Sequence, residues 1–184
     1  MKIEPLAIPG PLLILPERHA DARGYFAETF RKDLVEPLTG PVEFVQDNQS
    51  RSAKAGTVRG LHFQVAPSPQ AKLVHVIRGA VFDVAVDLRK SSPSYGRHVA
   101  ATLSAENLAV LYVPVGFAHG FCTLEPDTEV VYKASAYYDP AAEKGLLWND
   151  PALNIDWPFE ASAVTISDKD RTLPPLSRLG SWFD

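Results

Sequence analysis

Residues 73–88 read Leu-Val-His-Val-Ile-Arg-Gly-Ala-Val-Phe-Asp-Val-Ala-Val-Asp-Leu, and this stretch decides the class of fold. Arg78-Gly79 predicts a turn that divides it into two strands. In the second strand, bulky apolar residues alternate with small or acidic ones. The bulky residues are Phe82, Val84, Val86 and Leu88, and the small or acidic ones are Val81, Asp83, Ala85 and Asp87. Successive side chains of a strand point to opposite faces of its sheet. The pattern predicts a barrel strand with one face in a core and the other lining a polar cavity.

Short segments of strand character lie on both sides of this stretch. We expect strands at residues 12–15, 25–30, 44–48, 57–65, 98–103, 109–113 and 129–136, turns at 21–24 and 104–107, and loops at 50–56, 66–70 and 90–96. The first strand is expected at a sheet edge because prolines precede it, and a short helix at residues 30–35 is expected to end before Pro37. After Tyr138-Asp139-Pro140 the chain is aromatic and Pro-rich, and it is expected to wrap the barrel. Many short strands with almost no helical periodicity predict an all-β barrel or jelly roll.

The composition fits one domain over residues 1–184, because a chain of this length buries a core without metal or disulfide support. Its one cysteine, Cys122, cannot form an internal disulfide. The first residues lack the apolar core of a signal peptide, and no apolar run approaches membrane-spanning length. The formal net charge of -4 argues against general nucleic-acid binding, which needs a basic surface. We therefore expect a cytoplasmic protein that binds neither nucleic acid nor membrane.

Residues 59–64, Arg-Gly-Leu-His-Phe-Gln, place a cation, an imidazole and an amide in one expected strand. Imidazole titrates near pH ~6.5, so His62 can take up and return a proton at neutral pH. A histidine in an apolar strand is otherwise a hydrogen-bonded structural residue, and the hexapeptide alone favours that interpretation. Regular alternation would put Arg59 and His62 on opposite faces. We hypothesise that a bulge or a close backbone approach at Gly60 brings the two side chains together.

Four further stretches complete a pattern with this hexapeptide. They are residues 21–30 (Asp-Ala-Arg-Gly-Tyr-Phe-Ala-Glu-Thr-Phe), 46–48 (Gln-Asp-Asn), 114–121 (Pro-Val-Gly-Phe-Ala-His-Gly-Phe) and 166–170 (Ile-Ser-Asp-Lys-Asp). The chain resembles the dTDP-4-dehydrorhamnose 3,5-epimerase family in one register from about Ile3 to Leu176. The resemblance implies an all-β, cupin-like jelly roll (double-stranded β-helix) with short peripheral helices, a homodimer and no cofactor. It also implies conversion of dTDP-4-dehydro-6-deoxy-D-glucose to dTDP-4-dehydro-L-rhamnose, with inversion at C3 and C5, in dTDP-L-rhamnose biosynthesis.

Inverting a carbon beside a ketone requires a base, a group that stabilises the enolate oxygen, and an acid. The resemblance assigns the base to His62, the acid to Tyr132 and a lysine near the sugar to Lys72. It assigns the carboxylate that orients the base to Asp170, which the sequence alone would place in a solvated loop next to a second candidate, Asp168. A strand tyrosine such as Tyr132 has the alternative of filling the core with its hydroxyl satisfied.

Asp83 requires a partner if it is buried, because an unpaired buried charge is costly. Lys72 is the expected partner, either in a structural ion pair or in support of the catalytic groups. His75 stands where the family commonly has arginine, and Tyr95 where it commonly has phenylalanine. We expect His75 to be structural or to lie in an interface.

The resemblance also implies a set of substrate-binding residues. These are Arg23, Glu28, Gln46, Asn48, Arg59, His119, Tyr138, Glu143 and Lys169. Guanidinium groups suit phosphate oxygens, and Tyr138 matches the aromatic residue that stacks on the thymine. His119 lies in a glycine-containing stretch and has the alternative of a turn histidine.

No metal site and no nicotinamide site are expected from the sequence. The 5 histidines are scattered without a His-x-His pair, and no G-x-G-x-x-G fingerprint occurs. Three alternative functions remain open: a relative that inverts one carbon or isomerises the ketone, a non-catalytic nucleotide-sugar-binding jelly roll, and a metal-dependent cupin. Deuterium incorporation at C3 and C5 separates the first from a double epimerase, and removal of metal by a chelator tests the last.

Overall fold

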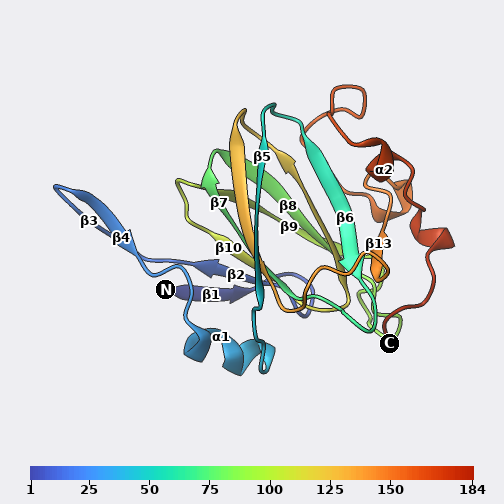
Figure 1. The fold of residues 1–184 in the computed structure, drawn as a ribbon, viewed down its shortest axis with the longest axis horizontal. Coiled ribbons are helices and arrows are strands. Elements are labelled where there is room, and N and C mark those ends of the chain that lie inside the picture. Colours follow the sequence, from blue (N-terminus) through green and yellow to red (C-terminus); the bar gives the residue numbers. More distant parts are fainter.

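Two antiparallel sheets face each other across the core of the computed structural model, which describes residues 1–184 (Figure 1). The six-stranded sheet has the order β1 (Lys2–Pro5), β2 (Leu12–Leu15), β10 (Val110–Val113), β7 (Lys72–Arg78), β12 (Thr128–Ala134) and β5 (Gln46–Ser52). The five-stranded sheet has the order β13 (Glu143–Gly145), β6 (Val58–Gln64), β11 (Phe117–Thr123), β8 (Ala80–Asp87) and β9 (His98–Ser104). The predicted all-β, cupin-like jelly roll is confirmed.

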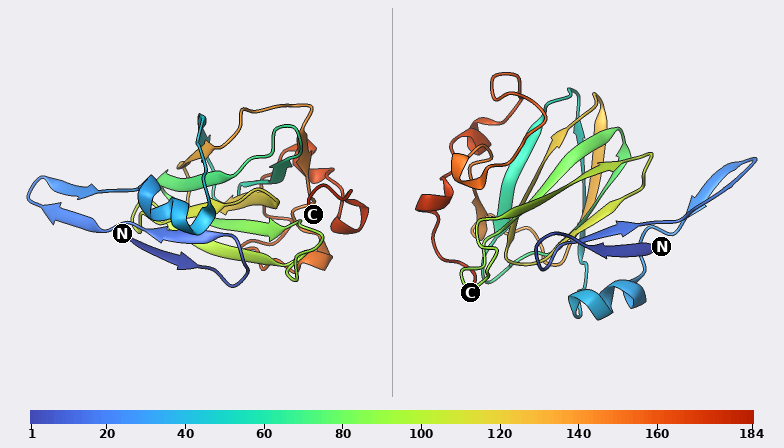
Figure 2. Two further views of the ribbon diagram at one scale, coloured as in Figure 1. Left: turned by 90° about the horizontal axis from the view of Figure 1, so that it is seen from below. Right: turned by 180° about the vertical axis from the view of Figure 1, so that it is seen from behind.

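Helices are short and peripheral. They are α1 (Lys32–Thr39), α2 (Asp168–Arg171) and two 3-10 turns, η1 (Pro151–Leu153) and η2 (Leu176–Arg178). A hairpin of β3 (Arg18–Asp21) and β4 (Gly24–Ala27) projects away from both sheets in every view (Figures 1 and 2). No helix is long and apolar enough to cross a membrane.

The main core lies between the two sheets, because both contribute apolar side chains to their facing sides. It contains Val74, Val76, Leu111 and Val130 from the six-stranded sheet and Val81, Ala85, Leu103 and Phe121 from the five-stranded one. The outer face of the five-stranded sheet is covered by the C-terminal segment, which lies beside β6 (Figure 1). α1 covers part of the outer face of the six-stranded sheet through Val35. These layers leave one end of the space between the sheets for a pocket.

The turn predicted at Arg78-Gly79 is confirmed, but it connects the two sheets rather than two neighbours in one sheet. β7 belongs to the six-stranded sheet and β8 to the five-stranded sheet. Both faces of β8 are buried, because the C-terminal segment packs on the side opposite the main core. The prediction that one face of β8 lines a polar cavity is therefore wrong, because no residue of this strand lines the pocket between the sheets.

Three boundary predictions are also wrong. The strand at residues 12–15 is not at an edge, because β1 pairs outside it. The strand expected at residues 44–48 begins at Gln46 and continues through Ser52 in pairing with β12, so part of the predicted loop is strand. The helix continues through Pro37, since the loss of one N–H does not end a helix that Val35 fixes against the sheet.

Candidate active site

A pocket of about 540 Å³ opens between the two sheets, with α2 on its rim. The five-stranded sheet contributes Arg59, His62 and His119, and the six-stranded sheet contributes Lys72 and Tyr132. The segment at residues 165–170 completes the wall with Lys169 and Asp170 among others. Seven of the residues singled out from the sequence therefore line one pocket.

An irregularity in β6 allows Arg59 and His62 to face the same space. In the β6–β11 ladder His62 pairs with His119, and Arg59 pairs with Phe121, so three steps on β6 oppose two on β11. Gly60 lies within this bulge with a φ of 123°. A Cβ at Gly60 would lie 2.7 Å from the Gly120 Cα and 2.9 Å from the His119 carbonyl oxygen. The hypothesis of a bulge with close backbone approach is confirmed, and only glycine fits it.

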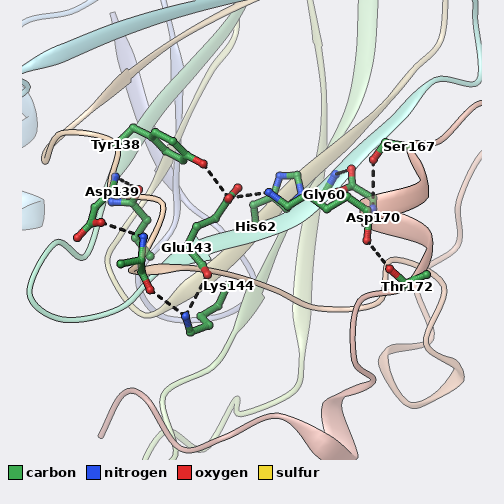
Figure 3. A network of polar contacts seen from close by, with 12 residues as sticks. Gly60, His62, Tyr138, Asp139, Glu143, Lys144, Ser167, Asp170 and Thr172 are labelled. Carbon is green, nitrogen blue, oxygen red and sulfur yellow. Dashed lines mark hydrogen bonds and ion pairs between the residues drawn. The ribbon is translucent and has the colours of Figure 1, made fainter.

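His62 is held by a carboxylate from the far end of the chain (Figure 3). Its Nε2 lies 2.7 Å from Asp170 Oδ1, and the Gly60 amide donates to Asp170 Oδ2 at 3.2 Å. Ser167 caps α2 by accepting from the Asp170 amide at 3.1 Å. Burial raises the pKa of Asp170, but the hydrogen bond and charge of His62 together with the bonds from Gly60 and Ser167 outweigh burial, so the net pKa lies below the usual value. Asp168 is exposed, so Asp170 rather than Asp168 is the carboxylate that contacts His62.

Lys72 is a buried cation in the pocket wall. Its Nζ donates to the His62 carbonyl oxygen at 3.5 Å and lies 5.8 Å from the centroid of the Tyr132 ring. Burial lowers the Lys72 pKa to about 8, while the charges of Asp83 and Glu143 act in the opposite direction. The ammonium therefore has negative groups nearby without a close ion pair.

Tyr132 enters the pocket from β12, on the sheet opposite His62. Burial raises the pKa of its phenol; the charge of Arg59 lowers it and that of Glu143 raises it. The phenol thus keeps its proton at neutral pH and can act as an acid. Its ring also packs against the main core. Tyr132 therefore both lines the pocket and fills part of the core, as the alternative interpretation expected.

A second histidine–aspartate pair lies beside the first. His119 Nε2 is 2.8 Å from Asp83 Oδ1, and both side chains are buried. The expectation that Lys72 directly pairs with Asp83 is therefore wrong, since the adjacent strand β11 brings His119 closer. The alternative of a turn histidine is also wrong, because His119 is in the middle of β11.

Five of the expected binding residues form a connected polar network, of which only Lys169 lines the pocket. Tyr138 Oη donates to Glu143 Oε2 at 2.9 Å (Figure 3). Lys169 Nζ lies 2.6 Å from the same oxygen. The Tyr138 amide donates to Gln46 Oε1 at 2.8 Å, and Gln46 Nε2 donates to Asn48 Oδ1 at 2.9 Å. The network joins β5, β13 and α2, so these expected binding residues are neighbours.

Arg23 and Glu28 do not line the pocket of their own chain. Arg23 occupies the tip of the β3–β4 hairpin and pairs with Asp21 at 2.5 Å. Glu28 follows β4 and lies 3.9 Å from Arg31. The hairpin carries this part of the expected binding set away from the other residues (Figure 2).

Several pocket residues were not singled out from the sequence. They are Ser50, Thr57, Val58, Phe121, Thr165, Ile166 and Ser167. Ser50 has the same parity as Gln46 and Asn48, so a longer strand at residues 46–52 would have predicted it. Ser167 precedes Asp170 by three residues, which is a helix N-cap signal. No group of three His, Cys, Asp or Glu side chains is arranged to hold a metal ion.

Comparison with known proteins gives one family. The family model described as dTDP-4-dehydrorhamnose 3,5-epimerase matches residues 5–178. The dTDP-4-dehydrorhamnose 3,5-epimerase of Sinorhizobium fredii is 50% identical over 183 residues, which cover 100% of this chain and 93% of the relative.

Solved structures agree with this match. A dTDP-4-dehydrorhamnose 3,5-epimerase from Bacillus anthracis, with TDP and PPi bound, has a TM-score of 0.90 and 48% identity, covering 95% of this chain and 99% of its own. A dTDP-6-deoxy-D-glucose-3,5-epimerase from Legionella pneumophila, in complex with dTDP-4-keto-L-rhamnose, has a TM-score of 0.91 and 42% identity, covering 97% and 94%.

Proposed function

The chain belongs to the dTDP-4-dehydrorhamnose 3,5-epimerase family, and we propose that it converts dTDP-4-dehydro-6-deoxy-D-glucose to dTDP-4-dehydro-L-rhamnose. The reaction inverts C3 and C5, the two carbons beside the C4 ketone. It belongs to the isomerase class and serves dTDP-L-rhamnose biosynthesis. The observation that carries the proposal is that His62 and Tyr132 enter one pocket from opposing sheets.

His62 is the proposed base. Because its Nε2 is bonded to Asp170, Nδ1 is the ring nitrogen left to take the proton from the sugar carbon. The adjacent carboxylate fixes this tautomer and stabilises the imidazolium that forms. Asp170 is buried, so its charge acts on the ring with little screening by solvent.

Negative charge moves onto the ketone oxygen when the proton leaves. Lys72 is the proposed stabiliser of that oxygen, because a buried ammonium without a close ion pair retains its attraction for a new negative charge. His119 lies in the same wall and is the proposed second contact to the sugar.

Tyr132 is the proposed acid that returns a proton from the other side of the ring. Inversion requires removal on one face of the sugar and delivery on the opposite face. A base on β6 and an acid on β12 meet this requirement for a ring bound between the two sheets. The chemistry uses side chains alone and requires no cofactor or metal.

The nucleotide part is proposed to bind at the mouth of the pocket. Arg59 and Lys169 supply positive charge for the diphosphate. Gln46, Asn48 and Glu143 supply polar contacts. Tyr138 is exposed beside them, where its ring is available to stack on the thymine.

A homodimer is proposed to complete each site. Arg23 and Glu28 belong to the expected binding set but lie on a projecting segment outside their own pocket. On the same hairpin, Tyr25 and Phe26 are 53% and 70% exposed, and covering such rings favours association. Insertion of the hairpin into a second copy would supply both polar residues to the partner's pocket. The proposed location is the cytoplasm, where a free buried thiol such as Cys122 remains reduced.

Turnover in deuterium oxide tests the reaction. The double epimerase incorporates solvent deuterium at both C3 and C5, whereas label at C3 alone would establish a single-carbon epimerase. Binding of the dTDP-sugar without any exchange would establish a non-catalytic binding protein. Full activity in the presence of a chelator is expected, and loss of activity that added metal restores would support a metal-dependent cupin instead.

A further inference from the structure

Asp83 is a buried acid that the proposed reaction does not yet use. It lies in the middle of β8, pairs in register with Phe121 of β11 and Ala101 of β9, and is 0% exposed. Its Oδ1 is bonded to His119, but its Oδ2 makes no hydrogen bond within the protein. A buried carboxylate oxygen without a partner is costly. The protein therefore retains at this position a charge that packing alone does not explain.

One consequence concerns the ring of His119. A carboxylate only accepts hydrogen bonds, so the Nε2 at 2.8 Å must carry the proton. Nδ1 is then the only ring nitrogen that can contact a ligand. Since His119 is 6% exposed, the walls of the pocket prevent the ring from turning freely. Asp83 thus decides which atom of His119 the substrate meets.

A second consequence concerns the charge of Lys72. The charged or titratable groups around this ammonium are those of the pocket wall and the two acids that act on its pKa: Arg59, His62, His119, Tyr132, Lys169, Asp170, Asp83 and Glu143. Of the three carboxylates in this set, Asp170 is bonded to His62, and Asp83 and Glu143 raise the Lys72 pKa, Asp83 more than Glu143. Glu143 is engaged by Lys169 and Tyr138, whereas Asp83 has one oxygen free.

We propose that Asp83 is a positioning residue with two partners: it fixes His119 in one tautomer and is the buried counterion that keeps Lys72 charged. It does not touch the substrate, and its effect on the reaction passes through these two side chains. The inference rests on the proposed function for its catalytic consequence, but both of its physical claims can be measured without turnover.

The sharpest test is Asp83→Asn, which keeps the shape of the side chain and removes its charge. Without the carboxylate, Lys72 should lose its proton at a lower pH, because a nearby negative charge favours the charged form of a lysine. Titration of ¹³Cε-labelled lysine by NMR, with Lys72→Arg to assign the signal, should show this downward shift. The alkaline limb of kcat/KM should move by the same amount, with a loss in kcat that exceeds any change in KM.

Asp87→Asn is the matched control. Asp87 is also on β8 and 0% exposed, but its partners are Arg89, Ser92 and Ser94, outside the pocket. This variant should lose stability without moving the Lys72 titration. An unmoved Lys72 titration in folded Asp83→Asn overturns the counterion claim, whether or not the enzyme is active on the dTDP-sugar.

Histidine ¹⁵N NMR of the wild-type protein tests the tautomer directly. A proton on Nε2 of neutral His119 is expected, and a proton on Nδ1 overturns the claim. This measurement needs no variant, so it decides the point even if Asp83→Asn does not fold. Asp83→Ser, which removes the charge and leaves more room, is the second variant for the Lys72 titration. An inactive protein that shows the expected titration and tautomer would contradict the proposed function while supporting this inference.

Discussion

His62 and His119 are direct cross-strand partners on β6 and β11, and the Nε2 of each ring faces a carboxylate. The two pairs differ in depth. The His62 side chain is 29% exposed, whereas that of His119 is 6% exposed. A base must reach the substrate and exchange its proton with solvent between turnovers, and the more exposed ring meets both needs. We therefore propose that the two similar pairs serve different tasks, with proton transfer at His62 and a fixed contact at His119.

His62→Ala should nearly abolish solvent exchange at C3 and C5. A positioned general base contributes about 100- to 10,000-fold, and the loss in exchange rate is expected in that range. Deuterium incorporation followed by NMR measures it. His98→Ala, a strand histidine outside the pocket, is the control and should exchange normally. Equal exchange in the His62 variant and the control would contradict the assignment of the base.

Tyr132→Phe should impair delivery of the proton more than its removal. The variant keeps the ring that packs against the core but lacks the hydroxyl, so exchange should persist while formation of the inverted product falls about 100-fold or more. NMR measures solvent exchange and formation of the inverted product separately. Tyr112→Phe removes a hydroxyl from another buried tyrosine and should leave both unchanged. Normal product formation in Tyr132→Phe would exclude the phenol as the acid.

The Lys72 pKa predicts a pH dependence of stability. Its value of about 8 in the folded state lies below the ordinary 10.5, so between these values the unfolded chain binds the proton and the folded chain does not. Stability contributed by this group therefore rises with pH over that range, by up to ~3 kcal/mol. Urea unfolding at pH 8 and pH 10 should show the wild type gaining stability relative to Lys72→Met. A loss of wild-type stability relative to Lys72→Met between pH 8 and pH 10 would contradict the lowered pKa.

Gly60→Ala should destabilise the fold and misplace His62. The added Cβ would lie 2.7 Å from the Gly120 Cα, and neither backbone can move without breaking the β6–β11 ladder. The expected cost is ~2–4 kcal/mol, because strain from the positive φ adds to the clash. Gly24→Ala is the matched control, since Gly24 has a similar φ of 131° but nothing within 4 Å of its Cβ position. Thermal unfolding should therefore separate the two variants, and equal losses would show that backbone strain alone matters.

Mixed dimers test whether the hairpin serves the partner's pocket. Arg23→Ala and His62→Ala proteins, each poorly active alone, should recover about a quarter of wild-type activity after mixing and random re-pairing, because one site in each mixed dimer is intact. Mixing His62→Ala with Tyr132→Phe should recover nothing, since both residues line one chain's pocket. No recovery in the first mixture would place Arg23 in its own chain's site or outside it.

The sequence predicted the strands well where alternation was strong and the site where motifs were continuous. The bulge in β6 could be predicted because Gly60 stands between Arg59 and His62, which regular alternation would place on opposite faces. By contrast, the prediction that Asp83 pairs with Lys72 was wrong, because its partner is His119. Strand pairing decides whether His119 or Lys72 lies nearer to it, and no local pattern encodes which strands become neighbours.

The extent of β5 was missed for a related reason. Its residues are polar on both faces, since one side carries Ser50 of the pocket with Gln46 and Asn48, and the other is exposed. Hydrophobic periodicity therefore gave no signal beyond Asn48. The position of the β3–β4 hairpin also lay beyond sequence reasoning. Its turn was predicted, but no local pattern encodes the direction of the hairpin relative to the sheets.

The partnership of His62 with Asp170 spans 108 residues of chain, and the bond from Gly60 to the same carboxylate spans 110. Both therefore close only after the chain through Asp170 has left the ribosome. The barrel can assemble from its earlier strands while the base is still without its aspartate, because long-range contacts form late when intervening chain must first be ordered. If Asp170 supports the base as proposed, catalytic competence in this protein would then be acquired after the barrel strands have paired, set by the arrival of a four-residue helix rather than by closure of the sheets.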